Sequence, residues 1–232
     1  ALCDALIITG TAVDGGKDSL SMAAADGQGG VCRSPGALTL TAYATCTDIT
    51  ATITPDLKKG VGGLVFVDLG SSALGGSALA QALGQLGSEA PDSDVESTTK
   101  AFDIVQTLIR DEVIVAGHDR SDGGLVTTLL EMAFAGGCGI SCSFTGSDRA
   151  TVLFNEAPGL VVQCAQGKEN DVLQAFAGLN AVQCGSIVGE DCAISVNGSV
   201  VLKAPLRELW KEWESTSFAM ERLQGRDADC VK

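Results

Sequence analysis

Apolar and polar residues follow one another along the chain in blocks that predict strands and helices in succession. Continuous apolar runs at 63–70 and 113–119 predict buried strands, and β-rich runs predict two more at 139–144 and 159–165. Two further runs joined by Asn197-Gly198, a pair suited to a type I′ turn, predict a hairpin. Apolar residues at helical spacing predict helices at 77–86, 98–111, 122–134, 168–178 and 206–223. The alternation predicts an α/β fold with a mixed sheet.

The residues before Pro55 follow a different pattern. Residues 1–10 start within an apolar periodicity and are typical of the last turns of a helix, and residues 38–48 alternate as a strand would. A connection rich in Pro and Gly follows, so we place a domain boundary near Pro55. The sequence therefore predicts three parts, namely residues 1–55, a self-contained unit at 56–224, and a linker that starts at 225–232.

Charge and cysteine content narrow the classes of function. The 29 Asp and Glu against 15 Lys and Arg give a formal net charge of −14, which opposes nonspecific binding to nucleic acid. No apolar run reaches the ~18 residues of a membrane helix, so we expect no membrane association and a cytoplasmic location. The nine cysteines contain no CxxC pair and accompany one histidine, which favours buried free thiols over zinc ligands. Because the chain is acidic overall, any phosphate that it binds needs a dedicated local binding site.

The segment GGKDSLSM at 15–22 is the first candidate for such a phosphate-binding site. Gly15 and Gly16 permit a positive φ and a close approach of main-chain amides to an anion. Lys17 supplies a cation and Ser19 a hydroxyl, whereas the spacing of a Walker loop is absent. A plain tight turn explains the two glycines equally well, so this segment alone does not decide between the two interpretations.

The second candidate is GHDRSDGGL at 117–125, where a predicted strand runs into a predicted helix. Ser121 or Asp122 is expected to cap that helix, whose N-terminus favours anions. A carboxylate beside two glycines also suits Mg²⁺ held between protein and phosphate. The alternative is an N-cap and turn without a ligand. Because no nucleophile is evident near His118, we interpret it as a hydrogen-bonded structural histidine.

These segments together resemble a known family. The strings DGGKDSLSM, SPGALTLTAYA, LGGSALAQALGQLG, HDRSDGGLVTTLLEMAFAGGCGI and LFNEAPGLVV occur in this order in the large, single-chain phosphoribosylformylglycinamidine synthases, and the eukaryotic members are the more similar ones. The resemblance covers essentially the whole chain. It implies the C-terminal-like domain of an aminoimidazole ribonucleotide synthetase fold at 56–224, preceded by the tail of an N-terminal-like lobe. The 225–232 segment would then start the linker to a glutaminase domain.

The resemblance also implies roles for individual residues. Asp119 matches an aspartate that helps to coordinate Mg²⁺ at a bound nucleotide, and Ser121 matches a serine that contacts this nucleotide. By the same resemblance we assign Gly16 and Lys17 to the phosphates of ATP or ADP, and Ser19 to formylglycinamide ribonucleotide, the nucleotide substrate. The family's partners are the rest of the same polypeptide, namely a first synthetase half and the glutaminase domain that supplies ammonia.

Three functions are compatible with these observations. The chain is part of an ATP-dependent ligase of purine biosynthesis, or it is a nucleotide-binding scaffold without a direct catalytic role. The third possibility is another member of the same ATP-binding superfamily, such as a selenophosphate synthetase or a hydrogenase-maturation protein. The order of the motifs favours the first, and we expect the 232-residue chain alone to lack synthase activity.

Overall fold

The computed structural model describes residues 2–17 and 21–224, which form two compact units divided between Thr50 and Ala51. The first unit contains helix α1 (Leu2–Thr9) and an antiparallel ribbon of β1 (Ala23–Ala25) and β2 (Val31–Arg33). None of its described residues is buried. The prediction of a helix near the start of the chain is confirmed, and the unit has no hydrophobic core of its own.

The strand predicted at 38–48 is wrong, because that segment has no regular structure. Its apolar side chains are exposed, with Leu38 71% and Tyr43 91% accessible to solvent. An alternating pattern forms a strand only when a neighbouring strand accepts its main-chain hydrogen bonds and a core covers one face.

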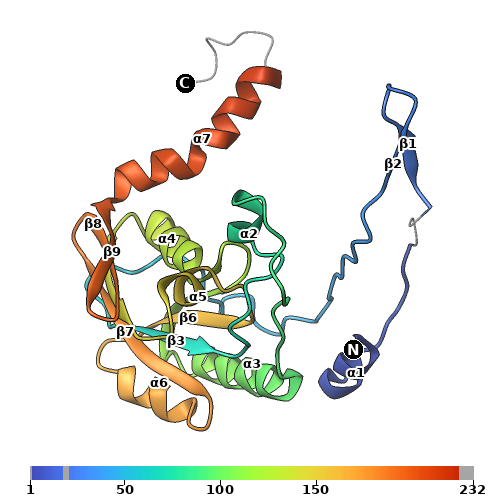
Figure 1. The fold of residues 1–232 in the computed structure, drawn as a ribbon. Helices are drawn as coiled ribbons and strands as arrows, with labels where there is room; N and C mark the ends of the chain where they lie inside the picture. Colours follow the sequence, from blue (N-terminus) through green and yellow to red (C-terminus); the bar gives the residue numbers. More distant parts are fainter. Residues whose placement is uncertain (1, 18–20, 225–232) are drawn as a thin grey trace. The chain divides into compact units, whose positions relative to one another are not determined.

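The second unit is built on a seven-stranded mixed sheet with the strand order β4-β6-β3-β7-β5-β8-β9 (Figure 1). Neighbouring strands are antiparallel except for the β5 and β8 pair, which is parallel. The predicted α/β fold with a mixed sheet is confirmed. The strands are β3 (Leu64–Asp68), β4 (Ile114–Asp119), β5 (Gly139–Phe144), β6 (Gly159–Cys164), β7 (Asn180–Val188), β8 (Asp191–Val196) and β9 (Ser199–Pro205).

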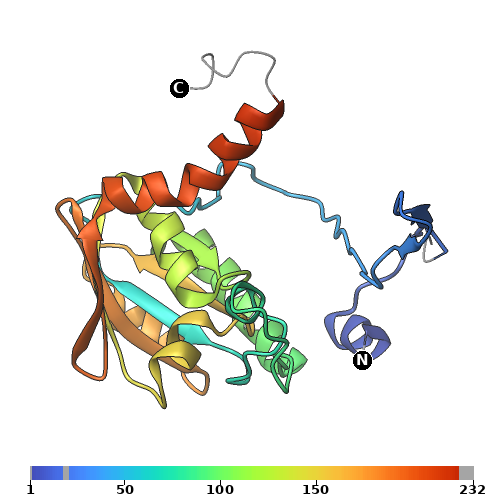
Figure 2. The ribbon, with the colours of Figure 1, turned by 45° about the horizontal axis from the view of Figure 1, so that its top comes forward.

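Helices cover both faces of this sheet. Helices α4 (Gly124–Gly136), α5 (Arg149–Phe154) and α7 (Leu206–Gln224) belong to one face, and α3 (Val95–Arg110) and α6 (Glu169–Ala175) to the other (Figure 2). Successive residues of β3 alternate between the two cores, so that Leu64 and Phe66 face α4 while Val65 and Val67 face α3. Burial on both faces explains why this strand has a continuous apolar run.

Helix boundaries differ from the predicted ones where capping residues decide them. Helix α3 starts at Val95, earlier than predicted, because Asp94 accepts the main-chain N–H groups of Glu96 and Ser97. Helix α2 is shorter than predicted and spans Ala78–Ala82, with Ser77 as its N-cap. The β7 strand and helix α5 were not predicted, since the β7 sequence mixes polar with apolar residues and α5 has only 6 residues.

The hairpin prediction is confirmed, because β8 pairs with β9 and both Asn197 (φ 51°) and Gly198 (φ 76°) have positive φ. The apolar side chains of α7 are only partly packed against the rest of the unit. Trp210 and Trp213 lie with their rings 6.0 and 5.6 Å from that of Phe134, whereas Leu223 is 88% exposed. None of the helices in the described part of the chain is long and apolar enough to cross a membrane.

Candidate functional site

The junction between β4 and α4 carries the second polar segment. Its two glycines have φ values of 84° (Gly123) and 74° (Gly124), a conformation that L side chains rarely adopt. A Cβ atom at Gly124 would also lie 2.6 Å from the main chain of Phe154. The prediction that Ser121 or Asp122 caps the helix is wrong. The N-cap residue is Gly123, which has no side chain to form a capping hydrogen bond. Ser121 and Asp122 are exposed instead.

A carboxylate from another part of the chain takes over the capping. The Oε1 atom of Glu156 accepts hydrogen bonds from the N–H of Gly123 at 2.7 Å and from the N–H of Ala78 at 2.8 Å. Ala78 is the first residue of α2, so one carboxylate stabilises the starts of two helices. Glu156 lies in the LFNEAPG string, to which the sequence analysis assigned no role.

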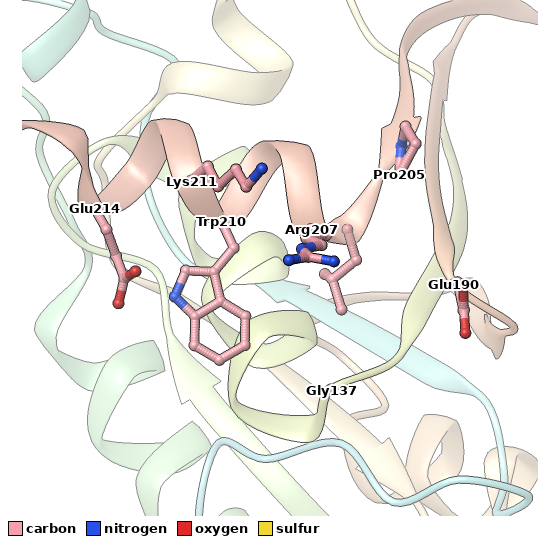
Figure 3. Close-up of a pocket in the computed structure, with 8 residues that line it drawn as sticks. Gly137, Glu190, Pro205, Arg207, Trp210, Lys211 and Glu214 are labelled. Carbon is pink, nitrogen blue, oxygen red and sulfur yellow. The ribbon is translucent and has the colours of Figure 1, made fainter. Parts of the chain in front are cut away.

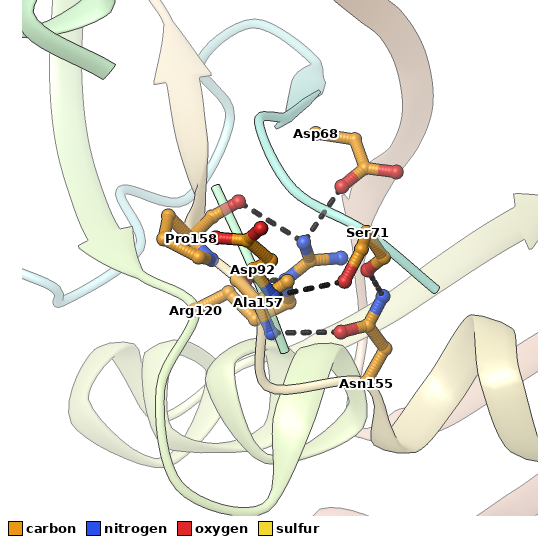
Figure 4. A network of polar contacts seen from close by, with 7 residues as sticks. All are labelled: Asp68, Ser71, Asp92, Arg120, Asn155, Ala157 and Pro158. Carbon is orange, nitrogen blue, oxygen red and sulfur yellow. Dashed lines mark hydrogen bonds and ion pairs between the residues drawn. The ribbon is translucent and has the colours of Figure 1, made fainter. Parts of the chain in front are cut away.

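Arg120, the residue that follows β4, is the centre of a network of polar contacts (Figure 4). Only 4% of this residue is exposed, and its Nε donates to the main-chain oxygen of Ala157 at 2.5 Å. Its Nη2 donates to the Asp68 carboxylate at 2.6 Å and to the oxygen of Pro158 at 3.0 Å. Asn155 extends the network by accepting from the N–H of Ala157 at 2.7 Å. The turn that carries Glu156 is thereby tied to the end of β4.

His118 and Asp119 are the last two residues of β4, directly before the junction. The Nδ1 atom of His118 lies 2.8 Å from the main-chain oxygen of Asp119 and 3.2 Å from its Oδ1, and the Nε2 atom lies 3.1 Å from Oε2 of Glu131 on α4. The interpretation of His118 as a hydrogen-bonded histidine is confirmed. The side chain of Asp119 is nevertheless 75% exposed, so it is available to a ligand.

A cavity of ≈ 720 Å³ opens beside this junction. Its volume lies within the ~300–1,000 Å³ of small-molecule sites. Part of the lining, here called the apolar wall, comes from apolar side chains of α3 and β6, and most of the polar lining residues come from the junction. The apolar wall includes Phe102, Val105, Ile109, Leu160 and Val162, and the polar side consists of His118, Asp119, Arg120, Ser121, Asp122 and Glu156. The structure thus brings two of the predicted site residues, Asp119 and Ser121, to one cavity.

The other predicted site residues lie in the first unit. Gly16 and Lys17 are exposed, and Ser19 lies outside the described residues. The positive φ that the glycine pair permits is not used, because neither Gly15 nor Gly16 has one, and a Cβ atom at either would meet nothing within 4 Å. The main chain at 15–16 therefore does not require glycine in this structure.

A second hollow, of ≈ 590 Å³, lies along the start of α7 (Figure 3). Trp210 lies among charged side chains of both signs there, namely Arg207, Lys211, Glu190 and Glu214. The hollow lacks a glycine turn at a helix start, so the β4–α4 cavity is the better candidate. The described part of the chain also contains no cluster of three or more His, Cys, Asp or Glu residues that would hold a metal by protein ligands alone.

The fold and this junction define a class of protein. Residues 62–197 match the C-terminal domain of the AIR synthase related proteins. The chain belongs to this family.

Known proteins with this domain include synthases of purine precursors. The chain is 49% identical over 247 residues to phosphoribosylformylglycinamidine synthase of Homo sapiens, an alignment that covers 99% of this chain and 18% of the human protein. Two structures of Thermotoga maritima PurL share the fold at 12–13% identity. The complex with FGAR has a TM-score of 0.58 and that with ATP 0.55, each covering 69% of this chain and 30% and 27% of the PurL chain.

Proposed function

We propose that this chain is a segment of a phosphoribosylformylglycinamidine synthase and that its β4–α4 cavity holds ATP or ADP together with Mg²⁺. The observation that carries the proposal is the exposed carboxylate of Asp119 at the rim of a cavity with one apolar wall. Further support comes from the identity to the human synthase over nearly the whole chain, and from a relative of the same fold whose complex contains ATP. The apolar wall suits a base, and the polar rim suits a polyphosphate.

The residues present fit a magnesium ion bound through phosphate. Mg²⁺ prefers oxygen ligands and is usually held by one or two carboxylates, with water and substrate phosphates completing its shell. Asp119 offers such a carboxylate, one oxygen of which lies 3.2 Å from the ring of His118. When bound, the ion would neutralise charge on the phosphates during transfer. His118 orients the carboxylate, and the Ser121 hydroxyl would donate to a phosphate oxygen.

The first unit has a proposed role as well. We assign Gly16 and Lys17 to the phosphates of a nucleotide and Ser19 to formylglycinamide ribonucleotide, as the resemblance implies. Residues 1–55 would be the end of an N-terminal-like lobe, and residues 225–232 the start of a linker. In a cytoplasmic parent polypeptide, a first synthetase half and a glutaminase domain would complete the reaction of formylglycinamide ribonucleotide, glutamine and ATP to formylglycinamidine ribonucleotide.

Calorimetric titration of the 232-residue chain with MgATP tests the nucleotide site. We expect saturable binding that weakens about tenfold or more in Asp119→Asn, because the amide loses the charge that holds the ion. Asp111→Asn is the matched control, since Asp111 is an exposed aspartate at the C-cap of α3 outside the cavity. Binding that is equally strong in wild type and Asp119→Asn would exclude a metal role for Asp119.

A second measurement separates a catalytic role from a scaffold role. The main-chain oxygen of Asp119 accepts from Thr128 on α4 at 3.0 Å, so the residue also belongs to the packing of the junction. In the assembled synthase, a lower kcat with an unchanged melting temperature in Asp119→Asn supports catalysis. An unchanged kcat with a lower melting temperature supports a scaffold. The chain alone is expected to form no amidine from glutamine or ammonia, ATP and the substrate.

A further inference from the structure

Glu156 accepts hydrogen bonds from main-chain amides at the starts of two helices beside the cavity. Main-chain N–H groups at a helix start bind phosphate because they are unpaired and lie at the positive end of the helix dipole. Here the N–H of Gly123, at the N-cap of α4, already donates to Oε1 of Glu156 at 2.7 Å. The N–H of Ala78 donates to the same oxygen. One main-chain donor at the start of α4 is therefore already paired with a carboxylate of the protein.

The second oxygen of this carboxylate, Oε2, differs from Oε1 in its hydrogen bonds. Both hydrogen bonds of Glu156 fall on Oε1, and within the described part of the chain Oε2 has no hydrogen-bond partner. Glu156 also lines the β4–α4 cavity, and the residue is only half-buried. The carboxylate, whose negative charge both oxygens share, therefore keeps one oxygen without a donor in the described part of the chain.

The charges of the cavity add to this effect. Asp119, Asp122 and Glu156 line it as carboxylates, and Arg120 is the cationic side chain among them. The guanidinium of Arg120 is already paired with Asp68. A polyphosphate without a counter-ion would therefore enter a cavity of its own sign, whereas a divalent cation converts the same carboxylates from repelling groups into attracting ones.

We propose that Glu156 makes this site selective for metal-bound nucleotide over free nucleotide. The inference rests on the proposed function of the cavity and adds a specificity-determining residue to it. Through Oε1 the carboxylate holds the starts of α2 and α4 in place, and its negative charge excludes polyphosphate that arrives without a cation. Removal of the charge alone should open the site to free ATP, whereas removal of the whole side chain should also loosen the two helix starts.

The test compares two affinities in the full 232-residue chain, that for ATP with excess Mg²⁺ and that for ATP with a chelator. Glu156→Gln keeps an oxygen acceptor for both N–H groups and loses the charge. We expect its preference for MgATP over free ATP to fall about tenfold, mainly through tighter binding of free ATP, as removal of a close like charge predicts. An unchanged preference overturns the inference.

Glu169→Gln is the matched control. Oε1 of Glu169 accepts from the N–H of Gly63 at 2.7 Å, so this variant also neutralises a carboxylate that accepts a main-chain hydrogen bond, but outside the cavity. Its preference for MgATP should equal that of wild type. An equal fall in both variants means that net charge alone sets the preference, and this result also overturns the inference.

The dependence of free-ATP binding on ionic strength gives a further test, which needs no variant. In wild type, screening of the repulsion should strengthen binding of free ATP as ionic strength rises. Weaker binding with rising salt would show that attraction governs the free nucleotide and would overturn the inference. If wild type binds neither form of ATP, the proposed function itself fails and the inference falls with it. If wild type binds MgATP and Glu156→Gln changes nothing, the inference alone fails.

Discussion

The guanidinium of Arg120 donates to the carboxylate of Asp68 at 2.6 Å and thereby joins the ends of two strands that are not neighbours. Asp68 ends β3 and Arg120 follows β4, and β6 lies between these two strands in the sheet. The same guanidinium lies with its central carbon 5.2 Å from the ring centroid of Phe66. A buried cation therefore ties the strand that leads into the candidate site to the middle of the sheet.

Replacement of Arg120 should destabilise the second unit strongly. Arg120→Met leaves the Asp68 carboxylate and the main-chain oxygen of Ala157 without this donor, and the oxygen of Pro158 keeps only the N–H of Leu69. We expect a loss of about 3–5 kcal/mol in the free energy of unfolding, measured by urea denaturation. Arg110→Met removes an exposed arginine from the end of α3 and should cost no more than about 0.5 kcal/mol. Equal stability of the two variants would contradict the structural role of Arg120.

Gln163 tests how the main chain near the start of the second unit is held against β6. This side chain is fully buried in β6, where its Oε1 accepts from the N–H of Lys58 at 2.7 Å and its Nε2 donates to the oxygen of Lys58 at 2.8 Å. Gln163→Leu should lower the free energy of unfolding by about 2–3 kcal/mol, because both main-chain groups lose their partner. Gln81→Leu, which changes an exposed glutamine, serves as the control. A stability loss of the same size in both would refute this assignment.

Cysteine reactivity should follow burial. Burial raises the pKa of the Cys164 thiol to about 12, with the nearby Glu169 carboxylate as a further cause, and Cys3, Cys32 and Cys46 are exposed. Because the thiolate is the reactive form, a thiol reagent at pH 8 should modify the three exposed cysteines quickly and Cys164 only after unfolding. Peptide mapping by mass spectrometry measures the rate at each position. Modification of Cys164 in the native chain as fast as that of Cys46 would contradict the fold.

Asp94 should contribute an acid-labile part of the stability. Hydrogen bonds from the Ser97 side chain and then from the main-chain N–H groups of Ser97 and Glu96 lower the pKa of this carboxyl below its ordinary value of 3.8. Its stabilisation is therefore complete above pH ~4 and is lost as the pH falls through the lowered pKa in the folded state. Melting temperatures of wild type and Asp94→Asn should converge as the pH falls below ~4. A difference that widens in acid would contradict the N-cap.

The sequence predicted those parts of the fold that depend on local pattern. Continuous apolar runs marked the buried strands β3 and β4, and Asn197-Gly198 marked the hairpin turn because few residue pairs adopt positive φ twice. The pattern failed where distant residues decide the outcome. The 38–48 segment alternates but has no partner strand, and the start of α4 is capped by a carboxylate far along the chain.

The candidate site could likewise be predicted from the sequence only in part. The roles of Asp119 and Ser121 were implied by the family resemblance, while their place between a strand and a helix indicated only an anion or Mg²⁺ site in general, and both residues line the cavity. Glu156 and the Arg120–Asp68 pair were not assigned to it, because their roles depend on the packing of three separate segments. Ser19 lies outside the described residues, so its predicted role stays a prediction.

The most direct test of the account locates a bound metal–nucleotide complex on the chain. Mn²⁺ substitutes for Mg²⁺ at oxygen-rich sites and broadens the NMR signals of nearby nuclei, so MnATP is added in small amounts to the ¹⁵N-labelled chain. We expect the amide signals of residues 119–124 to broaden first, while those at Gly63 and along α7 stay sharp. Broadening centred on the hollow beside Trp210, or no selective broadening at any position, would contradict a nucleotide site at the β4–α4 junction.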